Sequence, residues 1–195
     1  VTGSSLNSQL SSVPACQSII KKAVVKRLMA KHRTSTLPES GAEYKIRFML
    51  RKNVCEIMLD TTGEGLHKRG YRRNAMEAPI RETLAATIAD LGRVRRDSLV
   101  EDPFCGSGTL LIEAAQKAMN IAPGLKRRFA AERYSFVPAS IWAEQRQKAL
   151  AESKLDVGFE AFGYDIDPAA VALANANAKL AGVEKRCHFE VADVA

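Results

Sequence analysis

The sequence has few residues of the kinds that bind metal ions or build disulfide frameworks. Its 195 residues include four cysteines and three histidines. The cysteines lie far apart, with no C-x-x-C pair and no histidines at the spacing of zinc ligands. These absences exclude the common zinc motifs and predict that no metal ion is bound. Isolated thiols are typical of a reducing compartment, so we expect a cytoplasmic protein with reduced cysteines.

Long hydrophobic runs and targeting signals are lacking as well. No apolar segment approaches the ~18 residues that a membrane-spanning helix needs, and no signal sequence is found in the chain. The composition, 46% hydrophobic and 26% charged, is that of a globular protein. The chain begins with Val1 and ends at Ala195, directly after a predicted strand. We therefore expect it to be a fragment of a longer protein.

Acidic residues are fewer than basic ones, and the basic residues are clustered. The sequence holds 29 Lys and Arg against 22 Asp and Glu, a formal net charge of +7. Basic groups gather at residues 21–27, 67–73, 93–96 and 126–128. Such clusters favour a partner that carries phosphate groups, above all nucleic acid. A solvated surface is the alternative explanation.

Residues 1–60 are expected to fold as helix, strand and strand. Between 12 and 32, apolar residues recur at spacings of three and four with lysines and arginines between them. This pattern predicts an amphipathic helix with a basic face. Segments 42–50 and 54–60 alternate apolar and polar side chains on either side of a polar turn at 51–53, which predicts a β-hairpin.

The rest of the sequence predicts a parallel sheet with covering helices. Residues 61–78 are rich in glycine and basic residues and read as a linker or functional loop, and Pro79 begins a helix that Gly92 ends. Predicted strands at 98–102, 159–167 and 187–193 alternate with predicted helices at 109–120 and 168–182. This alternation is typical of an α/β fold with a parallel sheet. An insertion at 120–157 carries a further helix near 140–154.

The segment DPFCGSGT, residues 102–109, joins the first of these strands to its helix. Ligands bind at the carboxyl ends of strands in such sheets, and glycine lets the backbone come close to them. A dinucleotide fingerprint would need a third glycine where Leu111 stands, and a P-loop would need a lysine after Gly108. Cys105 and Ser107 lack a supporting histidine, and the glycine spacing is not that of a hydrolase elbow. Cys105 is more simply a small loop residue.

S-adenosylmethionine fits this pattern better, because it carries an ammonium group, a sulfonium and a ribose diol but no phosphate. Asp102 ends the first strand and could bind the ammonium group, and Asp165 ends the second and could bind both ribose hydroxyls. Ile166 could cover one face of the adenine, and Asp193, after the third strand, could accept from its amino group. Asp167 precedes a proline at a helix start, where an N-cap role is favoured over ligand binding.

Several stretches resemble the THUMP-domain RNA methyltransferases, in particular the bacterial enzymes that methylate N2 of a guanine in large-subunit ribosomal RNA. They are LHKRGYR and APIRETLAA at 66–72 and 78–86, DPFCGSGTLLIEAA at 102–115, NIAPGLKRRF at 120–129 and GYDIDPAAVALANANAKLAG at 163–182. The resemblance extends over nearly the whole chain. Together these stretches are more specific than the glycine loop alone.

The resemblance implies a Rossmann-like S-adenosylmethionine-dependent methyltransferase fold, with an incomplete parallel sheet, preceded by the C-terminal part of an α+β THUMP domain. Residues 1–60 would belong to the RNA-binding THUMP-like domain, 61–78 to a basic linker and 79–195 to the N-terminal part of the methyltransferase domain. The segment around Pro79 and Thr83 would touch the methionine end of the cofactor. The residues expected to bind the cofactor are Asp102, Pro103, Phe104, Cys105, Gly106, Gly108, Thr109, Asp165, Ile166, Asp193, Pro79 and Thr83.

The basic loop at 67–73 has two interpretations. In one, Lys68, Arg69, Arg72 and Arg73 contact RNA phosphates while Tyr71 stacks on a base. In the other, the segment is a solvated linker that caps the following helix.

The chain departs from the family in one respect. Family members carry a tetrapeptide of the Asn-Pro-Pro-Tyr type that holds the target amine, and no such tetrapeptide occurs here. We therefore expect this chain to bind the methyl donor, to contain no catalytic residue and to be inactive in isolation. The alternatives left open are adenine-N6 methylation of DNA, guanine-N2 methylation of transfer RNA, a nicotinamide-dependent oxidoreductase and a non-catalytic RNA-binding module.

Overall fold

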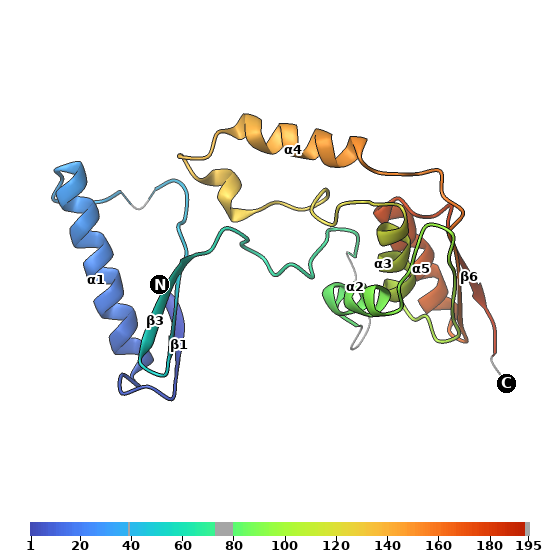
Figure 1. The fold of residues 1–195 in the computed structure, drawn as a ribbon, viewed down its shortest axis with the longest axis horizontal. Helices are drawn as coiled ribbons and strands as arrows, with labels where there is room; N and C mark the ends of the chain where they lie inside the picture. Colours follow the sequence, from blue (N-terminus) through green and yellow to red (C-terminus); the bar gives the residue numbers. More distant parts are fainter. Residues whose placement is uncertain (39, 73–79, 194–195) are drawn as a thin grey trace. The chain divides into compact units, whose positions relative to one another are not determined.

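The computed structural model describes residues 1–38, 40–72 and 80–193. The chain divides into two compact units (Figure 1). The first unit comprises Val1–Glu64 and Phe129–Pro138, and the second comprises Gly65–Arg128 and Ala139–Ala195. Part of the insertion therefore joins the first unit and not the second.

The first unit contains a three-stranded sheet and one long helix. Its elements are β1 (Thr2–Leu6), α1 (Val13–His32), β2 (Ile46–Arg51), β3 (Val54–Leu59) and the short 3-10 helix η1 (Ala130–Arg133). The strand order is β1-β2-β3, with β1 parallel and β3 antiparallel to β2. The predicted helix and hairpin are confirmed. The sequence did not reveal β1, because TGSSL has little hydrophobic character and becomes a strand by pairing with β2.

Helix α1 packs one narrow stripe against this sheet. The Ser12 hydroxyl caps its first turn by accepting from the backbone N–H of Ala15, and Cys16 packs with Phe48 and Leu50 of β2 in a small core. Ile19, expected on the apolar face, is exposed.

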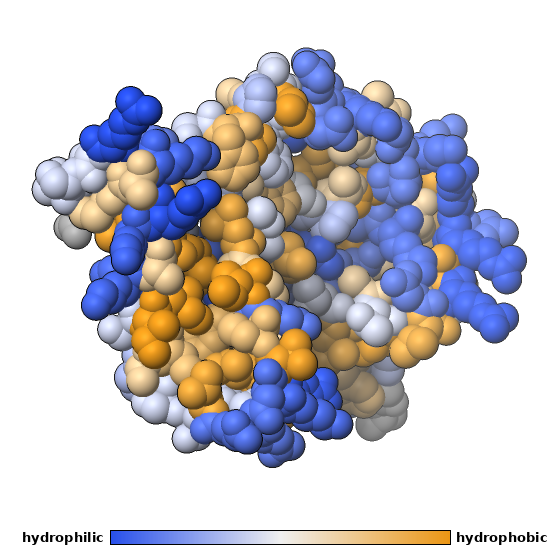
Figure 2. Space-filling model, turned by 60° about the vertical axis from the view of Figure 1, so that its left-hand side comes forward, coloured by the Kyte–Doolittle hydropathy of each residue, from blue (hydrophilic) through white to orange (hydrophobic). Residues whose placement is uncertain are grey.

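Hydrophobic side chains are also gathered at the molecular surface, beside groups of hydrophilic ones (Figure 2). Such side chains in the first unit include Val54 and Ile57.

The second unit contains the predicted parallel sheet. Its elements are α2 (Glu82–Leu91), β4 (Leu99–Asp102), α3 (Thr109–Ala118), α4 (Ala139–Ala151), β5 (Glu160–Asp165), α5 (Pro168–Ala181) and β6 (Cys187–Val191). The strand order is β4-β5-β6, and both pairs are parallel. Helix α3 contacts all three strands, and α5 contacts β5 and β6. The alternation of strands and helices predicted from the sequence is confirmed.

The core of the second unit lies where α3 and α5 meet the sheet. Leu111 of α3 and Ala161 of β5 are fully buried, and a Cβ atom on Gly163 would lie only 2.9 Å from the Leu111 Cδ1 atom. Small residues on β5 therefore let α3 approach the strands closely. This packing fixes the start of α3 above the carboxyl end of β4.

The ends of the helices follow their sequence signals. Asp167 is the N-cap of α5, with its side chain accepting from the backbone N–H of Ala169 at 2.8 Å, as predicted. Gly92 ends α2 as predicted, but the helix begins at Glu82 and not at Pro79, because Arg81 before it is extended. Pro79 itself lies outside the described residues. No helix in the described ranges has the length and apolar character to cross a membrane.

Candidate functional site

The loop between β4 and α3 is held in shape by its glycines and by the next strand. The backbone N–H of Cys105 donates to the carbonyl oxygen of Tyr164 on β5 at 2.8 Å. Gly108 has a φ of 75°, and a Cβ atom there would lie 2.8 Å from Cζ of Phe189 and 3.0 Å from Cβ of Ala174. Only glycine combines this left-handed conformation with so close an approach to its neighbours.

Gly106, in the same loop, borders open space, whereas Gly108 is tightly packed. Its φ is 52°, and a Cβ atom on it would meet no other atom within 4 Å. Its backbone N–H donates to Oδ2 of Asp165 at 2.9 Å. The loop backbone therefore borders open space beside the Asp165 carboxylate. The sequence predicts that a ligand binds at this loop.

Acidic residues lie at the carboxyl ends of all three parallel strands. Asp102 is the last residue of β4 and lies opposite Gly163, two residues before Asp165. Asp165 is the last residue of β5 and lies opposite Val191, two residues before Asp193. Because the strands are parallel, these carboxylates follow one edge of the sheet in a regular stagger.

The carboxylates at this edge are oriented by the backbone. Oδ1 of Asp102 accepts from the N–H of Phe104 at 3.1 Å, and Oδ1 of Asp165 accepts from the N–H of Asp167 at 3.0 Å. With the bond from Gly106, the Asp165 carboxylate accepts hydrogen bonds from two backbone N–H groups. An ionised carboxylate offers about four acceptor positions. Asp165 is half-buried and keeps capacity for the two hydroxyls of a ribose.

Two large apolar side chains stand out from this edge of the sheet. Phe104 is 76% exposed and Ile166 is 70% exposed. Each follows a strand-end aspartate, Phe104 two residues after Asp102 and Ile166 directly after Asp165. Exposed apolar side chains beside fixed carboxylates suit a ligand that has both a planar ring and polar groups.

The remaining predicted cofactor residues differ in accessibility. Pro103 is exposed, and Thr83 is exposed on α2. Thr109 is buried, and its hydroxyl lies 3.1 Å from that of Ser107. Thr109 therefore supports the loop from inside, and its contact with the cofactor stays a prediction. Pro79 lies outside the described residues.

One residue that positions the loop was missed by the sequence analysis. Asn177 on α5 is 1% exposed, and its Nδ2 donates to the carbonyl oxygen of Ser107 at 3.1 Å. The sequence did contain a signal for this role: Asn177 is a polar residue on the buried face of α5, which also includes Ala170, Ala174 and Ala178. A polar side chain on a buried helix face normally has a specific partner, and here the partner is the glycine loop.

The Cys105 thiol in this loop is expected to be a poor nucleophile. Burial raises the pKa of the Cys105 thiol to about 12, with further contributions from the charges of Asp102 and Asp165. The thiolate is the nucleophilic form, so Cys105 stays protonated near neutral pH. This geometry supports its interpretation as a loop residue.

The four thiols are expected to differ sharply toward an alkylating reagent. Cys55 is exposed, whereas Cys16, Cys105 and Cys187 are buried. Treatment of the folded protein with iodoacetamide at mildly alkaline pH should therefore modify Cys55 alone, as measured by peptide mass spectrometry. The Cys55→Ser variant is the control and should remain unmodified. Rapid alkylation of Cys105 in the folded protein would contradict this assignment.

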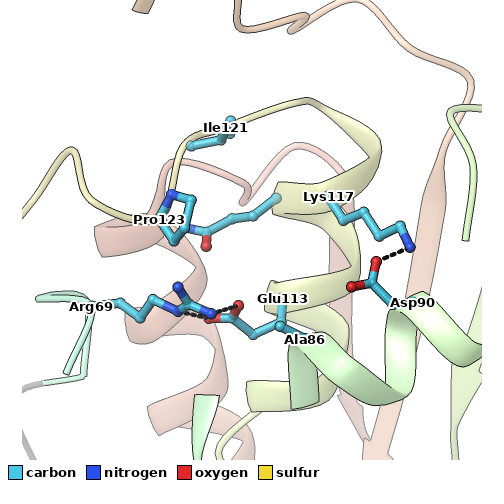
Figure 3. A pocket seen from close by; sticks show the side chains of 8 residues that line it. Arg69, Ala86, Asp90, Glu113, Lys117, Ile121 and Pro123 are labelled. Carbon is cyan, nitrogen blue, oxygen red and sulfur yellow. Dashed lines mark hydrogen bonds and ion pairs between the residues drawn. The ribbon is translucent and has the colours of Figure 1, made fainter. Parts of the chain in front are cut away.

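The basic loop before α2 contacts buried acids. The Arg69 guanidinium forms two contacts with the Glu113 carboxylate, at 3.2 Å and 3.1 Å, and the hydroxyl of Tyr71 donates to the same carboxylate at 3.0 Å (Figure 3 shows the Arg69 pair). Burial raises the pKa of Glu113, while the charge of Arg69 and the bond from Tyr71 lower it. The pair therefore anchors this loop to α3.

Arg72 has a similar structural role. Its Nη2 lies 3.1 Å from Oε2 of Glu82, which is buried on α2, and its Nη1 donates to the carbonyl oxygen of Ile80 at 3.1 Å. Nη1 also lies 3.5 Å from the hydroxyl of Thr109. One guanidinium thus joins the basic loop, the start of α2 and the start of α3.

These contacts correct part of the predicted RNA interface. Tyr71 is 1% exposed, so the predicted stacking of its ring on a base is wrong in this structure. The predicted phosphate contacts of Arg69 and Arg72 are also wrong here, because both guanidinium groups are largely buried and paired with carboxylates. Lys68 is exposed and stays a predicted RNA contact, and Arg73 lies outside the described residues.

A pocket of about 140 Å³ lies beside the Arg69 pair (Figure 3). It is lined by residues of the basic loop, of α2, of α3 and of the loop after α3: Arg69, Ala86, Asp90, Glu113, Gln116, Lys117, Ile121 and Pro123. Its charged groups form the ion pairs Arg69–Glu113 and Lys117–Asp90. It contains none of the predicted cofactor residues, so it is distinct from the strand-end site. Across the described ranges no cluster of three or more His, Cys, Asp or Glu could hold a metal ion.

Known proteins are similar in sequence to this chain over most of its length. It is 42% identical over 192 residues to the Bacillus subtilis (strain 168) protein named "Putative RNA methyltransferase YpsC", covering 97% of this chain and 50% of YpsC. It is 43% identical over 157 residues to the ribosomal RNA large subunit methyltransferase K/L of Shewanella baltica (strain OS185), covering 78% of this chain and 22% of that protein. The chain thus spans half or less of the length of these relatives.

Solved structures share the arrangement of strands and helices. One, named "predicted N6-adenine-specific DNA methylase" from Listeria monocytogenes, has a TM-score of 0.95 and 42% identity over 99% of this chain and 51% of its own. Another, SMU.472, named "a putative methyltransferase complexed with SAH", has a TM-score of 0.90 and 39% identity over 98% of this chain and 51% of its own. The parallel sheet with its flanking helices is therefore an α/β methyltransferase fold. Residues 69–195 match the family model described as "RMKL-like, methyltransferase domain", and the chain belongs to the RMKL-like methyltransferase family.

Proposed function

We propose that this chain binds S-adenosylmethionine at the carboxyl edge of the β4-β5-β6 sheet, as the donor-binding part of an RNA methyltransferase. The observation that carries the proposal is the contact between Gly106 and Asp165. A loop backbone that leaves room for a ligand lies directly beside this half-buried carboxylate. The carboxylate can still accept further hydrogen bonds. The SAH complex of SMU.472 supports the same class of ligand.

The residues of this edge suit the separate parts of the donor. Asp165 would accept from the ribose hydroxyls, and Asp102 would bind the ammonium group through a charge-assisted hydrogen bond. Ile166 would cover an adenine face, and Asp193 would accept from the adenine amino group. Pro103, Phe104, Cys105, Gly106, Gly108 and Thr109 would form or support the loop wall of the donor site, and Thr83 would contact the methionine end.

The chemistry needs positioning more than activation by the protein. The sulfonium of the donor supplies an already activated methyl group, so the protein's contribution is to hold donor and acceptor in line. The fixed backbone bonds to Asp102 and Asp165 supply that rigidity on the donor side. The acceptor tetrapeptide does not occur in these 195 residues.

We further propose RNA as the substrate, with N2 of a guanine in large-subunit ribosomal RNA as the target. The names of the Bacillus subtilis and Shewanella baltica relatives support an RNA substrate. The first unit would be the end of a THUMP-like RNA-binding domain, and the exposed lysines and arginines of α1 would suit phosphate contacts. The name of the Listeria monocytogenes structure keeps adenine-N6 methylation of DNA as the second candidate.

Replacing Asp165 with alanine is expected to weaken S-adenosylmethionine binding at least tenfold. The change removes a charged acceptor, worth about 1.5–3 kcal/mol for a hydrogen bond to a charged group, and releases the Gly106 N–H. Isothermal titration calorimetry of the protein at its natural length would measure this effect, with circular dichroism confirming that the variant is folded. NADH, titrated in parallel, should not bind.

The matched control is Asp167→Asn, two residues away. Asp167 caps α5, and asparagine is an equally good N-cap, so donor affinity should stay within a factor of two or so of the wild-type value. Equal donor affinity for the Asp165→Ala variant would remove the proposed site. Methylation assays with ribosomal RNA, transfer RNA and DNA would then separate the candidate substrates.

A further inference from the structure

An aromatic cluster in the first unit joins two segments that are distant in the sequence. The rings of Tyr44 and Tyr134 stack with centroids 4.6 Å apart and an interplanar angle of 21°. The ring of Phe136 lies 6.3 Å from that of Tyr44, at 23°, and 5.6 Å from that of Tyr134, at 35°. The three rings thus form one compact cluster that joins the segment before β2 to the segment after η1.

One ring of this cluster is buried, whereas the other two are exposed. Tyr134 is 1% exposed, and its hydroxyl donates to the carbonyl oxygen of Asp60. The hydroxyl of Tyr44 accepts from the backbone N–H of Ser135 at 3.2 Å. Tyr44 and Phe136 are 41% and 65% exposed. Exposed rings that are held in place by packing and hydrogen bonds lose less entropy when a planar group stacks on them.

The backbone around the cluster is fixed as well. The N–H of Ala130 donates to the carbonyl oxygen of Thr62 at 3.3 Å, and the N–H of Ala131 donates to that of Thr61 at 3.1 Å. Oδ1 of Asp60 accepts from the N–H groups of Thr62 and Gly63, both at 3.0 Å. The segment that carries Phe136 is therefore attached to the end of the β2-β3 hairpin.

Basic and acidic side chains both lie near the rings. The N–H of Asp60 donates to the carbonyl oxygen of Lys45 at 2.8 Å. Hydrogen bonds from Gly63 and Thr62 lower the pKa of Asp60, and the positive charges of Arg47 and Lys45 lower it further. Arg133 is exposed directly before Tyr134. The acids are Asp60, Glu132 directly before Arg133, and Glu43, which pairs with Lys45 at 3.6 Å in an exposed ion pair. Exposed aromatic faces with basic side chains beside them are the combination that binds single-stranded nucleic acid.

We propose that Phe136 and Tyr44 form a stacking platform for an unpaired base of the RNA substrate. Buried Tyr134 supports the platform, and Lys45, Arg47 and Arg133 are placed to contact the flanking phosphates. The inference rests on the proposed function, since it assumes an RNA substrate, and it assigns the first unit a contact with single-stranded RNA. Stacking accepts any base, so the platform would position the RNA without reading its sequence.

Phe136→Ala should weaken binding of a fluorescein-labelled single-stranded RNA roughly 5- to 150-fold, the equivalent of ~1–3 kcal/mol for one stacked base. The measurement is fluorescence anisotropy on the protein at its natural length. Phe136→Trp should keep or increase the affinity because it enlarges the aromatic face. Phe136→Leu should lose affinity although it remains apolar. The matched control is Ile57→Ala, since Ile57 is 61% exposed in the same unit and its replacement should leave RNA affinity unchanged.

Salt dependence separates the roles of the residues. Stacking releases no counterions, so Phe136→Ala should shift the binding curves equally at all salt concentrations. Arg47→Ala should instead reduce the salt slope by about one unit. Duplex RNA, which has no unpaired base, should bind the wild-type and Phe136→Ala proteins equally.

Two results would overturn the platform while leaving the proposed function intact. One is equal affinity of wild-type and Phe136→Ala proteins for single-stranded RNA. The other is a large loss of thermal stability in both Phe136→Ala and Phe136→Trp, which would show that the ring packs against protein. If the wild-type protein binds S-adenosylmethionine but no RNA, the RNA substrate itself is wrong and the platform falls with it.

Discussion

Replacing Glu113 with alanine is expected to lower the free energy of unfolding of the second unit by about 3–5 kcal/mol, the cost of removing one partner from a buried ion pair. The Glu113 side chain is 3% exposed and that of Arg69 is 11% exposed. The change leaves the Arg69 guanidinium without its carboxylate and deprives the buried Tyr71 hydroxyl of its acceptor. Urea denaturation followed by circular dichroism measures the loss as a lower midpoint at constant slope.

Two further variants test whether burial is the cause. Lys148 pairs with Glu152 at 3.9 Å on the surface, with side chains 68% and 58% exposed. Lys148→Ala should therefore cost at most about 0.5 kcal/mol. The double variant Arg69→Met with Glu113→Leu removes both charges together and should recover much of the lost stability. A loss below about 1 kcal/mol in Glu113→Ala would contradict the anchoring role of this pair.

Replacing Gly108 with valine is expected to cost about 2–5 kcal/mol and to abolish donor binding. A left-handed conformation costs a residue with a side chain about 1–2 kcal/mol, and forcing atoms into a packed region costs about 1–3 kcal/mol more. The Cβ position alone would lie 2.8 Å from the Phe189 ring. Relief of that contact must displace β6 or the glycine loop, so stability and affinity should fall together.

Gly106→Ala is the matched comparison in the same loop. Its φ is also positive, but a Cβ atom there meets nothing within 4 Å. Alanine should therefore cost only the conformational penalty of about 1–2 kcal/mol, while its methyl group occupies space that we assign to the donor. Thermal unfolding and calorimetric titration of both variants check this contrast. Unchanged donor affinity in a folded Gly106→Ala protein would place the donor elsewhere.

The sequence determined the features that depend on local signals. The order of strands and helices follows from hydrophobic periodicity, and the N-cap at Asp167 follows from its place before a proline. Strand ends in a parallel sheet share one edge, so the positions of Asp102 and Asp165 could also be predicted. The glycines of the loop were recognisable because backbone geometry requires them, and the structure gives Gly108 a φ of 75°.

Only the tertiary structure decided which partners the charged and aromatic residues take. In sequence, HKRGYRR reads as a basic surface, yet Arg69 and Tyr71 find Glu113 more than forty residues away. The strand β1 exists because β2 offers a parallel edge, and the rings at 134 and 136 meet Tyr44 across 90 residues or more. Periodicity and local propensity carry no information about such pairings. These pairings form because a charged or polar group that is buried in the folded chain must find a partner inside the protein. Which partner it finds depends on the packing of segments that are distant in the sequence.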